Sequence, residues 1–148
     1  MGLAGPSKRE DLEMRSYVQC LLWLLLSVCH ANAQELPGVT DKEIKIGQTM
    51  PYSGPGSHYS TIARANEAYF QMINENGGIN GRKIKLISLD DAYSPPKTVE
   101  QTRKLIEQEE VLLIFDTLGT ATNAAIQKYL NARKVPASLS DFGSDPLR

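Results

Sequence analysis

IKIGQTMPYSGPG, at residues 44–56, is the stretch from which the fold can be inferred. A short apolar run ends in a turn rich in proline, glycine and serine, and that turn leads into a long helical pattern. This is the order of a β-loop-α unit. Two further strand-then-helix segments follow, so we expect the turn after Thr49 to lie at one end of a parallel sheet, beside the turn after the third strand.

Four stretches have the character of strands, and they occupy residues 44–49, 83–89, 111–115 and 137–140. VLLIF at 111–115 is almost wholly apolar, which suits a central strand covered by helices on both faces. In KIKLISL at 83–89, the alternation of apolar and basic residues predicts two unequal faces. This predicted strand ends at Asp90 and Asp91.

The first helix is predicted over residues 58–76, where the pair Gly77-Gly78 ends it. One set of apolar residues recurs there at helical spacing and is predicted to form the buried stripe: Ile62, Ala65, Tyr69 and Met72 or Ile73.

Two more helices are predicted after the second and third strands. One begins with Ser94 as its N-cap and Pro95 at the first helical position, and it continues to about residue 109. The other is capped by Thr120 or Thr122, and its buried stripe is carried by Ile126, Tyr129 and Leu130.

The resulting order, β-α-β-α-β-α-β, predicts a doubly wound α/β fold with a mostly parallel sheet. With strand order 2-1-3-4, the winding direction reverses between strands one and three, and ligands bind outside the carboxyl ends of the strands at such a point. The turns at 50–59 and 116–120 meet there. The second leads into a helix N-terminus, which favours a carboxylate or phosphate.

Length and composition fit one soluble domain. The chain has 148 residues, of which 41% are hydrophobic and 22% charged. The formal net charge of −1 gives no electrostatic reason to expect nucleic acid or an anionic membrane as a partner.

A secretory signal peptide is predicted at residues 1–33, followed by a polar lead-in at 34–43. Residues 17–28 are a short apolar run, and Ala31-Asn32-Ala33 has the small-residue pattern that precedes cleavage. Because the acids before Met14 make a poor start for a signal, the sequence predicts that translation begins at Met14. An uncleaved anchor or a buried core helix are the alternative interpretations.

Both cysteines, Cys20 and Cys29, fall within the predicted signal. Cleavage after Ala33 would leave none for a disulfide, a thiolate metal site or a cysteine nucleophile. A lipid anchor on Cys29 is an alternative, although Val28 is larger than the residue preferred before such a cysteine.

Three segments, MPYSGPGSHY, INENGGINGRKIKLISLDDAYSPPKTVEQTRKLIEQEEV and TLGTATNAAIQKYLNARKVP, closely resemble the first lobe of ABC-transporter solute-binding proteins of the leucine/isoleucine/valine-binding type. The resemblance covers about residues 44–136. It implies a periplasmic type I binding protein for amino acids or small aromatic carboxylates, with two lobes, a membrane permease as partner, no cofactor and no catalysis. Residues 44–148 would be its N-terminal lobe, cut short before the hinge and the second lobe.

The resemblance also implies ligand-binding residues. Thr120 matches a hydroxyl residue that holds the solute's carboxylate, and Leu118 and Gly119 form the turn around it. Tyr59 matches a tyrosine that packs over the solute, and Ser140 begins a later turn, at 140–144, that supplies further contacts.

Several of these positions have other interpretations. Thr120 is also a helix cap, and Tyr59 is also a staple for the first helix. Asp116 and the segment SLSDFGSDP depart from the family pattern. A carboxylate at 116 would either repel an anionic solute or point to solvent.

A different class of function uses Asp90 and Asp91, which follow a strand as the acids of metal or phospho-acceptor sites do. That hypothesis describes a small doubly wound enzyme or phosphate-binding domain, with the turn at Gly56 as a second element. The competing interpretation is that Asp90 and Asp91 stabilise a turn. Residues 53–56 lack the spacing of a phosphate loop, and His58 has no recognisable triad partners.

Overall fold

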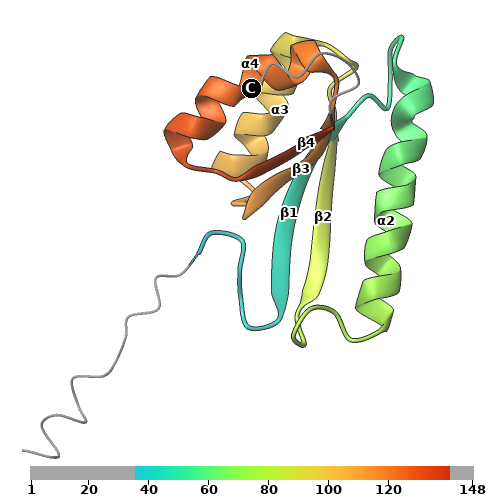
Figure 1. The fold of residues 1–148 in the computed structure, drawn as a ribbon, viewed down its shortest axis with the longest axis vertical. Coiled ribbons are helices and arrows are strands. Elements are labelled where there is room, and N and C mark those ends of the chain that lie inside the picture. The colour runs from blue at the N-terminus through green and yellow to red at the C-terminus, as the bar shows by residue number, and fades with distance from the viewer. Residues whose placement is uncertain (1–35, 141–148) are drawn as a thin grey trace, which may run out of the picture. The chain divides into compact units, whose positions relative to one another are not determined.

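The computed structural model describes residues 36–140, which form a four-stranded parallel sheet with helices on both faces (Figure 1). The strands are β1 (Glu43–Met50), β2 (Lys83–Asp90), β3 (Leu113–Leu118) and β4 (Ala137–Ser140). The helices are η1 (Ser57–Tyr59), α2 (Ser60–Glu75), α3 (Pro95–Glu107) and α4 (Thr120–Arg133). The strand order β2-β1-β3-β4 confirms the predicted doubly wound topology. The predicted signal peptide and the turn after Ser140 lie outside the described residues.

Helix α2 covers the face of the sheet formed by β1 and β2 (Figure 1). Phe70 on this helix packs against Ile46 and Ile84, one from each strand. Its ring also meets Phe115 of β3 edge-on, with centroids 5.4 Å apart. Such aromatic pairs add to the free energy gained by burial.

The buried stripe of α2 is only partly the one predicted, because Ile62 and Ile73 are half-buried and pack against the core. Tyr69 and Met72 are 57% and 50% exposed, and Ala65 is exposed as well, whereas Ala63 and Phe70 are buried. Apolar residues cover more than half of the circumference of this helix, so periodicity alone does not show which stripe meets the sheet. The contact between Phe70 and Phe115 determines which stripe of α2 faces the sheet.

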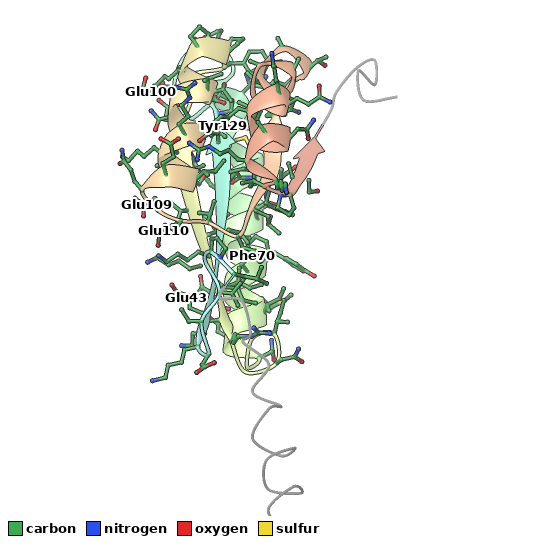
Figure 2. All side chains as sticks on the ribbon, turned by 90° about the vertical axis from the view of Figure 1, so that its left-hand side faces the viewer. Glu43, Phe70, Glu100, Glu109, Glu110 and Tyr129 are labelled. Carbon is green, nitrogen blue, oxygen red and sulfur yellow. The ribbon has the colours of Figure 1, made fainter. Side chains whose placement is uncertain are left out.

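Helices α3 and α4 cover the opposite face. Their core with the sheet consists of fully buried aliphatic residues, namely Leu105, Val111, Ile114, Ile126 and Leu130. Glu100, Glu109 and Glu110 lie on the outer flank of the molecule, and Tyr129 lies between α3 and α4 (Figure 2). None of the helices within residues 36–140 is long and apolar enough to cross a membrane.

Strand β3 spans Leu113–Leu118 rather than the predicted 111–115, and it contains a bulge. Asp116 has φ +53°, and the pairing with β4 shifts between Phe115 and Thr117. The bulge lets the strand continue through two polar residues and directs Leu118 into a cluster with Met50. Asp116 is therefore not in the turn at the strand end.

The side chain of Asp116 meets α2. Asn66 Nδ2 donates a hydrogen bond to Asp116 Oδ2 at 2.6 Å. The carboxylate is therefore half-buried against α2 rather than pointing freely to solvent, and its effect on an anionic solute stays a prediction.

Candidate functional site

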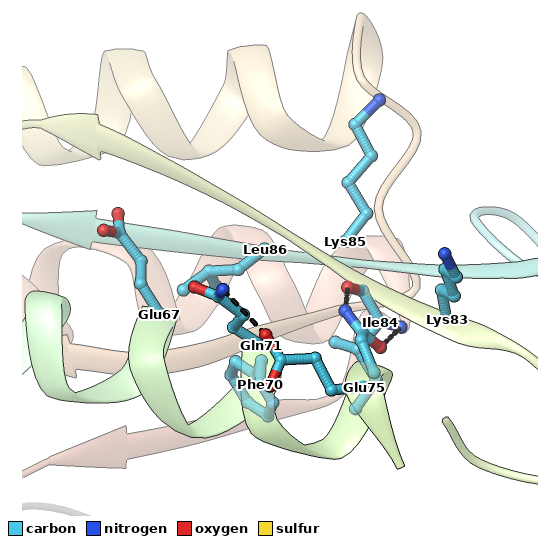
Figure 3. Close-up of a pocket in the computed structure, with 9 residues that line it drawn as sticks. Glu67, Phe70, Gln71, Glu75, Lys83, Ile84, Lys85 and Leu86 are labelled. Atoms are coloured by element: carbon cyan, nitrogen blue, oxygen red, sulfur yellow. Dashed lines mark hydrogen bonds between the residues drawn. The ribbon is translucent and has the colours of Figure 1, made fainter. Parts of the chain in front are cut away.

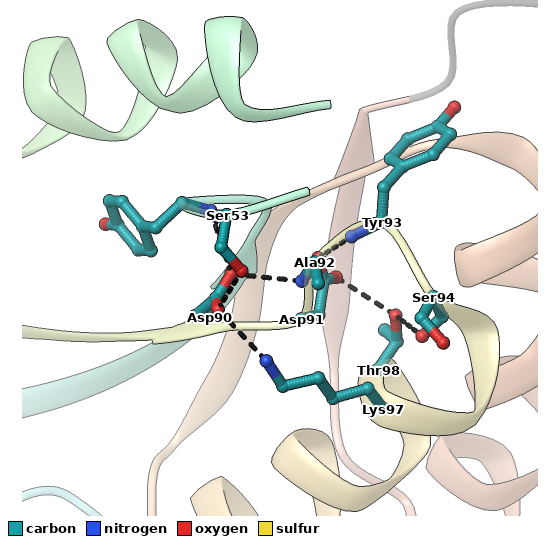
Figure 4. A network of polar contacts seen from close by, with 9 residues as sticks. Ser53, Asp90, Asp91, Ala92, Tyr93, Ser94, Lys97 and Thr98 are labelled. Carbon is teal, nitrogen blue, oxygen red and sulfur yellow. Dashed lines mark hydrogen bonds and ion pairs between the residues drawn. The ribbon is translucent and has the colours of Figure 1, made fainter. Parts of the chain in front are cut away.

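Three turns meet at the carboxyl edge of the sheet. They follow β1 (residues 51–56, leading into η1), β2 (residues 91–94) and β3 (Gly119), and they lie together because parallel strands end at the same edge. Side chains that follow β2 connect the first two turns and α3 (Figure 4).

Asp90 ties the turn after β1 to the end of β2. Its carboxylate accepts hydrogen bonds from the backbone N–H groups of Tyr52, Ser53 and Ala92 at 3.0–3.1 Å. The Ser53 hydroxyl donates at 2.6 Å, and Lys97 Nζ forms an ion pair at 3.0 Å. Burial alone raises the pKa of Asp90, but the hydrogen bonds from Ser53 and Lys97, with those from the backbone, hold it well below its usual range.

Asp91 fixes the turn after β2 on helix α3. Its side chain is buried, and its two oxygens accept hydrogen bonds from the Tyr93 backbone N–H at 2.9 Å and the Thr98 hydroxyl at 3.0 Å. Asp90 and Asp91 therefore have the turn-stabilising role that the sequence suggested as one of two possibilities. Within residues 36–140, no group of three or more His, Cys, Asp or Glu residues is placed to hold a metal ion.

Tyr93 lies between the turns that follow β1 and β3. A Cβ atom added to Gly119 would be 2.8 Å from Tyr93 Cε2, and one added to Gly56 would be 3.1 Å from Tyr93 Cβ. The residue is 43% exposed, and both Ala92 and Tyr93 have left-handed backbone conformations, with φ of +51° and +57°. Sequence reasoning missed Tyr93; its position in the turn that follows β2 was the local signal, and that position does not indicate these contacts.

Gly119 leads from β3 into α4 and is the N-cap of that helix, with φ +98° and ψ +141°. Neither Thr120 nor Thr122 occupies the cap position, which corrects the sequence prediction. Thr120 is the first helical residue, and the Thr122 hydroxyl donates back to the carbonyl oxygens of Leu118 and Gly119. Glycine has no side chain with which to cap the helix.

The other predicted site residues lie at the same edge but differ in access. Tyr59 is the residue before α2, is 40% exposed, and stacks at a tilt on His58 with ring centroids 4.0 Å apart. The Leu118 side chain is buried against Met50. Ser140 is paired with Leu118 across β3 and β4, so its backbone reaches the same edge.

A network of polar side chains lies next to the carboxyl edge, on the face of the sheet that α2 covers. The Tyr52 hydroxyl donates to Ser88, Ser88 donates to Gln48 Oε1, and Gln48 Nε2 donates to the Asp116 carbonyl oxygen. Burial raises the pKa of the Tyr52 hydroxyl above its usual value. The network joins the turn after β1 to the bulge of β3.

A groove of about 500 Å³ lies away from this edge, between α2 and β2 (Figure 3). Its wall carries acids and lysines together, for example Glu67 and Glu75 opposite Lys83 and Lys85. Asn74 bridges the backbone N–H and carbonyl of Ile84, both at 2.8 Å or less, and so closes the edge of β2 there. The groove is open and has no converging charge of one sign.

A doubly wound parallel sheet whose carboxyl-edge turns surround a helix N-terminus is the architecture of a ligand-binding α/β lobe. The chain belongs to the periplasmic binding protein family, whose model matches residues 43–145. This membership confirms the family resemblance that the sequence motifs indicated.

Three relatives illustrate the family. The chain is 32% identical, over 76% of its length, to Leu/Ile/Val-binding protein homolog 7 of Brucella suis, of which it covers 28%. It is 30% identical to a fatty acid ABC transporter substrate-binding protein of Thermomonospora curvata (TM-score 0.65; 72% of this chain, 27% of that one). It is 27% identical to an ABC-transporter solute-binding protein of Rhodopseudomonas palustris in complex with 3,4-dihydroxybenzoic acid (TM-score 0.57; 67% and 27%). The chain thus spans less than a third of each relative.

Proposed function

We propose that this chain forms one lobe of an extracytoplasmic solute-binding protein of an ABC transporter, and that the lobe holds the carboxylate of a small organic acid or amino acid. The observation that carries the proposal is the N-terminus of α4, which begins at the carboxyl edge, where Tyr93 of the turn after β2 lies against Gly119. The positive end of a helix dipole and its first N–H groups favour an anion there.

The solutes in the relatives' names share this chemistry. Leucine, isoleucine, valine, fatty acids and 3,4-dihydroxybenzoic acid all carry a carboxylate, while the remainder of each molecule differs. A site for the shared group on this lobe therefore fits every one of them.

Each predicted residue has a role in this proposal. The Thr120 hydroxyl and backbone N–H bind the carboxylate, and Gly119 forms the turn that leads to Thr120. Leu118 contributes through its backbone, because its side chain is in the core. Tyr59 packs over the solute, and Ser140 brings the end of β4 to the same edge.

The proposal extends to the rest of the transport system. Residues 1–33 direct export to the periplasm, residues 44–148 are the N-terminal lobe, a second lobe closes over the solute, and a membrane permease receives it. One lobe leaves the solute partly in water, so we expect dissociation constants on the order of millimolar for this chain alone.

A titration of the full chain followed by ¹⁵N NMR tests the carboxylate site. We expect 3,4-dihydroxybenzoate and leucine to bind, and 3,4-dihydroxybenzyl alcohol, which lacks the carboxylate, to bind at least about tenfold more weakly. Thr120→Ala should weaken binding about fivefold or more, and Thr120→Ser should restore most of it. Unchanged affinity in Thr120→Ala, or equal binding of the alcohol, would contradict the proposal.

A further inference from the structure

Tyr93 is placed where it can contact a solute at the carboxyl edge. Its ring packs over the backbone of Gly119, with Cε2 and the hydroxyl 2.8 and 2.9 Å from where a Cβ atom would be. Its Cβ and Cγ lie against Gly56 in the turn after β1. Because both neighbours are glycines, the ring approaches two backbones closely and no side chain of either residue covers it.

This placement carries a conformational cost. Ala92 and Tyr93 both adopt the left-handed conformation, which disfavours residues with a Cβ atom. Yet 43% of Tyr93 stays exposed, so the ring buries only part of its surface in return. Strained residues of this kind concentrate at ligand-binding sites.

The conformation is nevertheless held firmly. The buried carboxylate of Asp91 accepts the Tyr93 N–H and is itself bonded to Thr98 of α3. In Figure 4 the Tyr93 ring projects away from this contact and leaves the network. The backbone is therefore fixed while one side of the ring faces outward.

We propose that Tyr93 is a specificity-determining residue, and that its open ring face stacks on the planar group of a small aromatic carboxylate. This inference rests on the proposed carboxylate site at Thr120. Aromatic pairs gain free energy beyond the area that they bury, and an aliphatic solute of the same size gains only the area. Tyr59, which is also exposed at this edge, adds a second aromatic surface.

The acids of the same edge favour such a solute over an amino acid. Among the described residues there, Asp90 is paired with Lys97, and Asp91 is bonded to the turn after β2 and to Thr98. An acid already engaged in this way is poorly suited to bind an α-ammonium group as well. A benzoate-type acid has no ammonium group, so it does not need an acidic side chain as a partner.

Benzoate and cyclohexanecarboxylate test the inference, because they differ in aromaticity and planarity but share the charge and the ring size. We expect the full chain to bind benzoate about three- to tenfold more tightly in ¹⁵N NMR titrations. Tyr93→Ala should lower this ratio, with Tyr59 retaining part of the preference, and Tyr93→Phe should preserve it. Tyr69→Ala is the matched control, since Tyr69 is similarly exposed but lies on α2, and it should leave the ratio unchanged.

The outcomes separate the two proposals, and the NMR spectrum of each variant reports whether it is folded. If both acids bind but the ratio in Tyr93→Ala equals that of the unmodified chain, the role of Tyr93 is refuted and the carboxylate site stands. The same holds if the unmodified chain shows no preference for benzoate. If neither acid binds the unmodified chain, the carboxylate site itself is refuted, and the role of Tyr93 with it.

Discussion

The turns at the two edges of the sheet are built differently. At the carboxyl edge, side chains join turns that are far apart in sequence, as Asp90 does with Ser53. At the opposite edge, the turns close chiefly through backbone hydrogen bonds between nearby residues, such as Ile79 N–H to the Arg82 carbonyl and Val135 N–H to the Leu130 carbonyl. The carboxyl edge therefore depends mainly on particular side chains. The opposite edge depends more on backbone hydrogen bonds, with added contacts from the Asn74 and Lys45 side chains.

The largest difference is expected for glycine substitutions at the two edges. Gly119→Ala should cost about 3 kcal/mol, because φ is +98° and the Tyr93 ring and the Thr122 hydroxyl must both move. Gly77→Ala has nearly the same φ, +97°, but no atom within 4 Å of the new Cβ, so about 1 kcal/mol is expected. Urea unfolding measures both.

A double variant sharpens this prediction. Adding Tyr93→Ala to Gly119→Ala should recover part of the loss, because the ring no longer blocks the new methyl group. Equal losses for Gly119→Ala and Gly77→Ala would show that the contact between Tyr93 and Gly119 does not constrain the turn.

Asp90→Asn is expected to have the next largest effect. It removes the charge that Lys97 pairs with and that strengthens the hydrogen bonds from Tyr52 and Ser53, at a cost of about 2 kcal/mol. Asp41→Asn is the control at the opposite edge, where the side chain is exposed, and it should be nearly neutral. A loss at position 41 as large as that at position 90 would remove the distinction between the edges.

The pH dependence of stability should report the same carboxylate. The pKa of Asp90 is lower in the folded chain than in the unfolded chain, so its contribution is complete above about pH 4 and is lost as the pH falls below that value. At pH 3 the loss is about 1 kcal/mol at most, because the side chain is 32% exposed and water screens its charge. Urea midpoints at pH 6 and pH 3 should therefore differ less in Asp90→Asn than in the unmodified chain; an equal difference would assign the acid sensitivity to other groups.

The smallest expected effect is a gain in stability. Ala92→Gly relieves a left-handed alanine and should raise stability by about 0.5 kcal/mol. Asn80→Gly, at the opposite edge and with the same φ of +51°, should gain less, because asparagine tolerates this conformation better. Thermal unfolding of both variants gives the comparison, and a larger gain at Asn80 would show that Ala92 is not strained.

The topology could be predicted from sequence because each strand and helix has its own local signal. The apolar run before Phe115, the Ser94-Pro95 helix start and the pattern at 137–140 each fixed an element, and right-handed crossovers left few arrangements of the sheet. Asp90 and Asp91 were likewise placed correctly at a strand end.

The errors arose where distant contacts decide the outcome. The bulge at Asp116 extends β3 through residues whose sequence is typical of a turn. The Asp116 carboxylate accepts a hydrogen bond from Asn66, which lies fifty positions earlier in the sequence. Tyr93 was overlooked because its direction depends on a left-handed turn that Asp91 holds. Local sequence patterns carry no information on either contact.

The most direct test of the account is to map where a carboxylate binds on the full chain. Titration with 3,4-dihydroxybenzoate, followed by ¹⁵N NMR, should shift the amide signals of residues 56–59, 92–93 and 118–122 at the carboxyl edge. The signals of Glu67, Gln71 and Lys85, which line the groove between α2 and β2, should stay in place. Shifts confined to that groove, or none at any residue, would contradict the claim that the carboxyl edge is the binding end of this lobe.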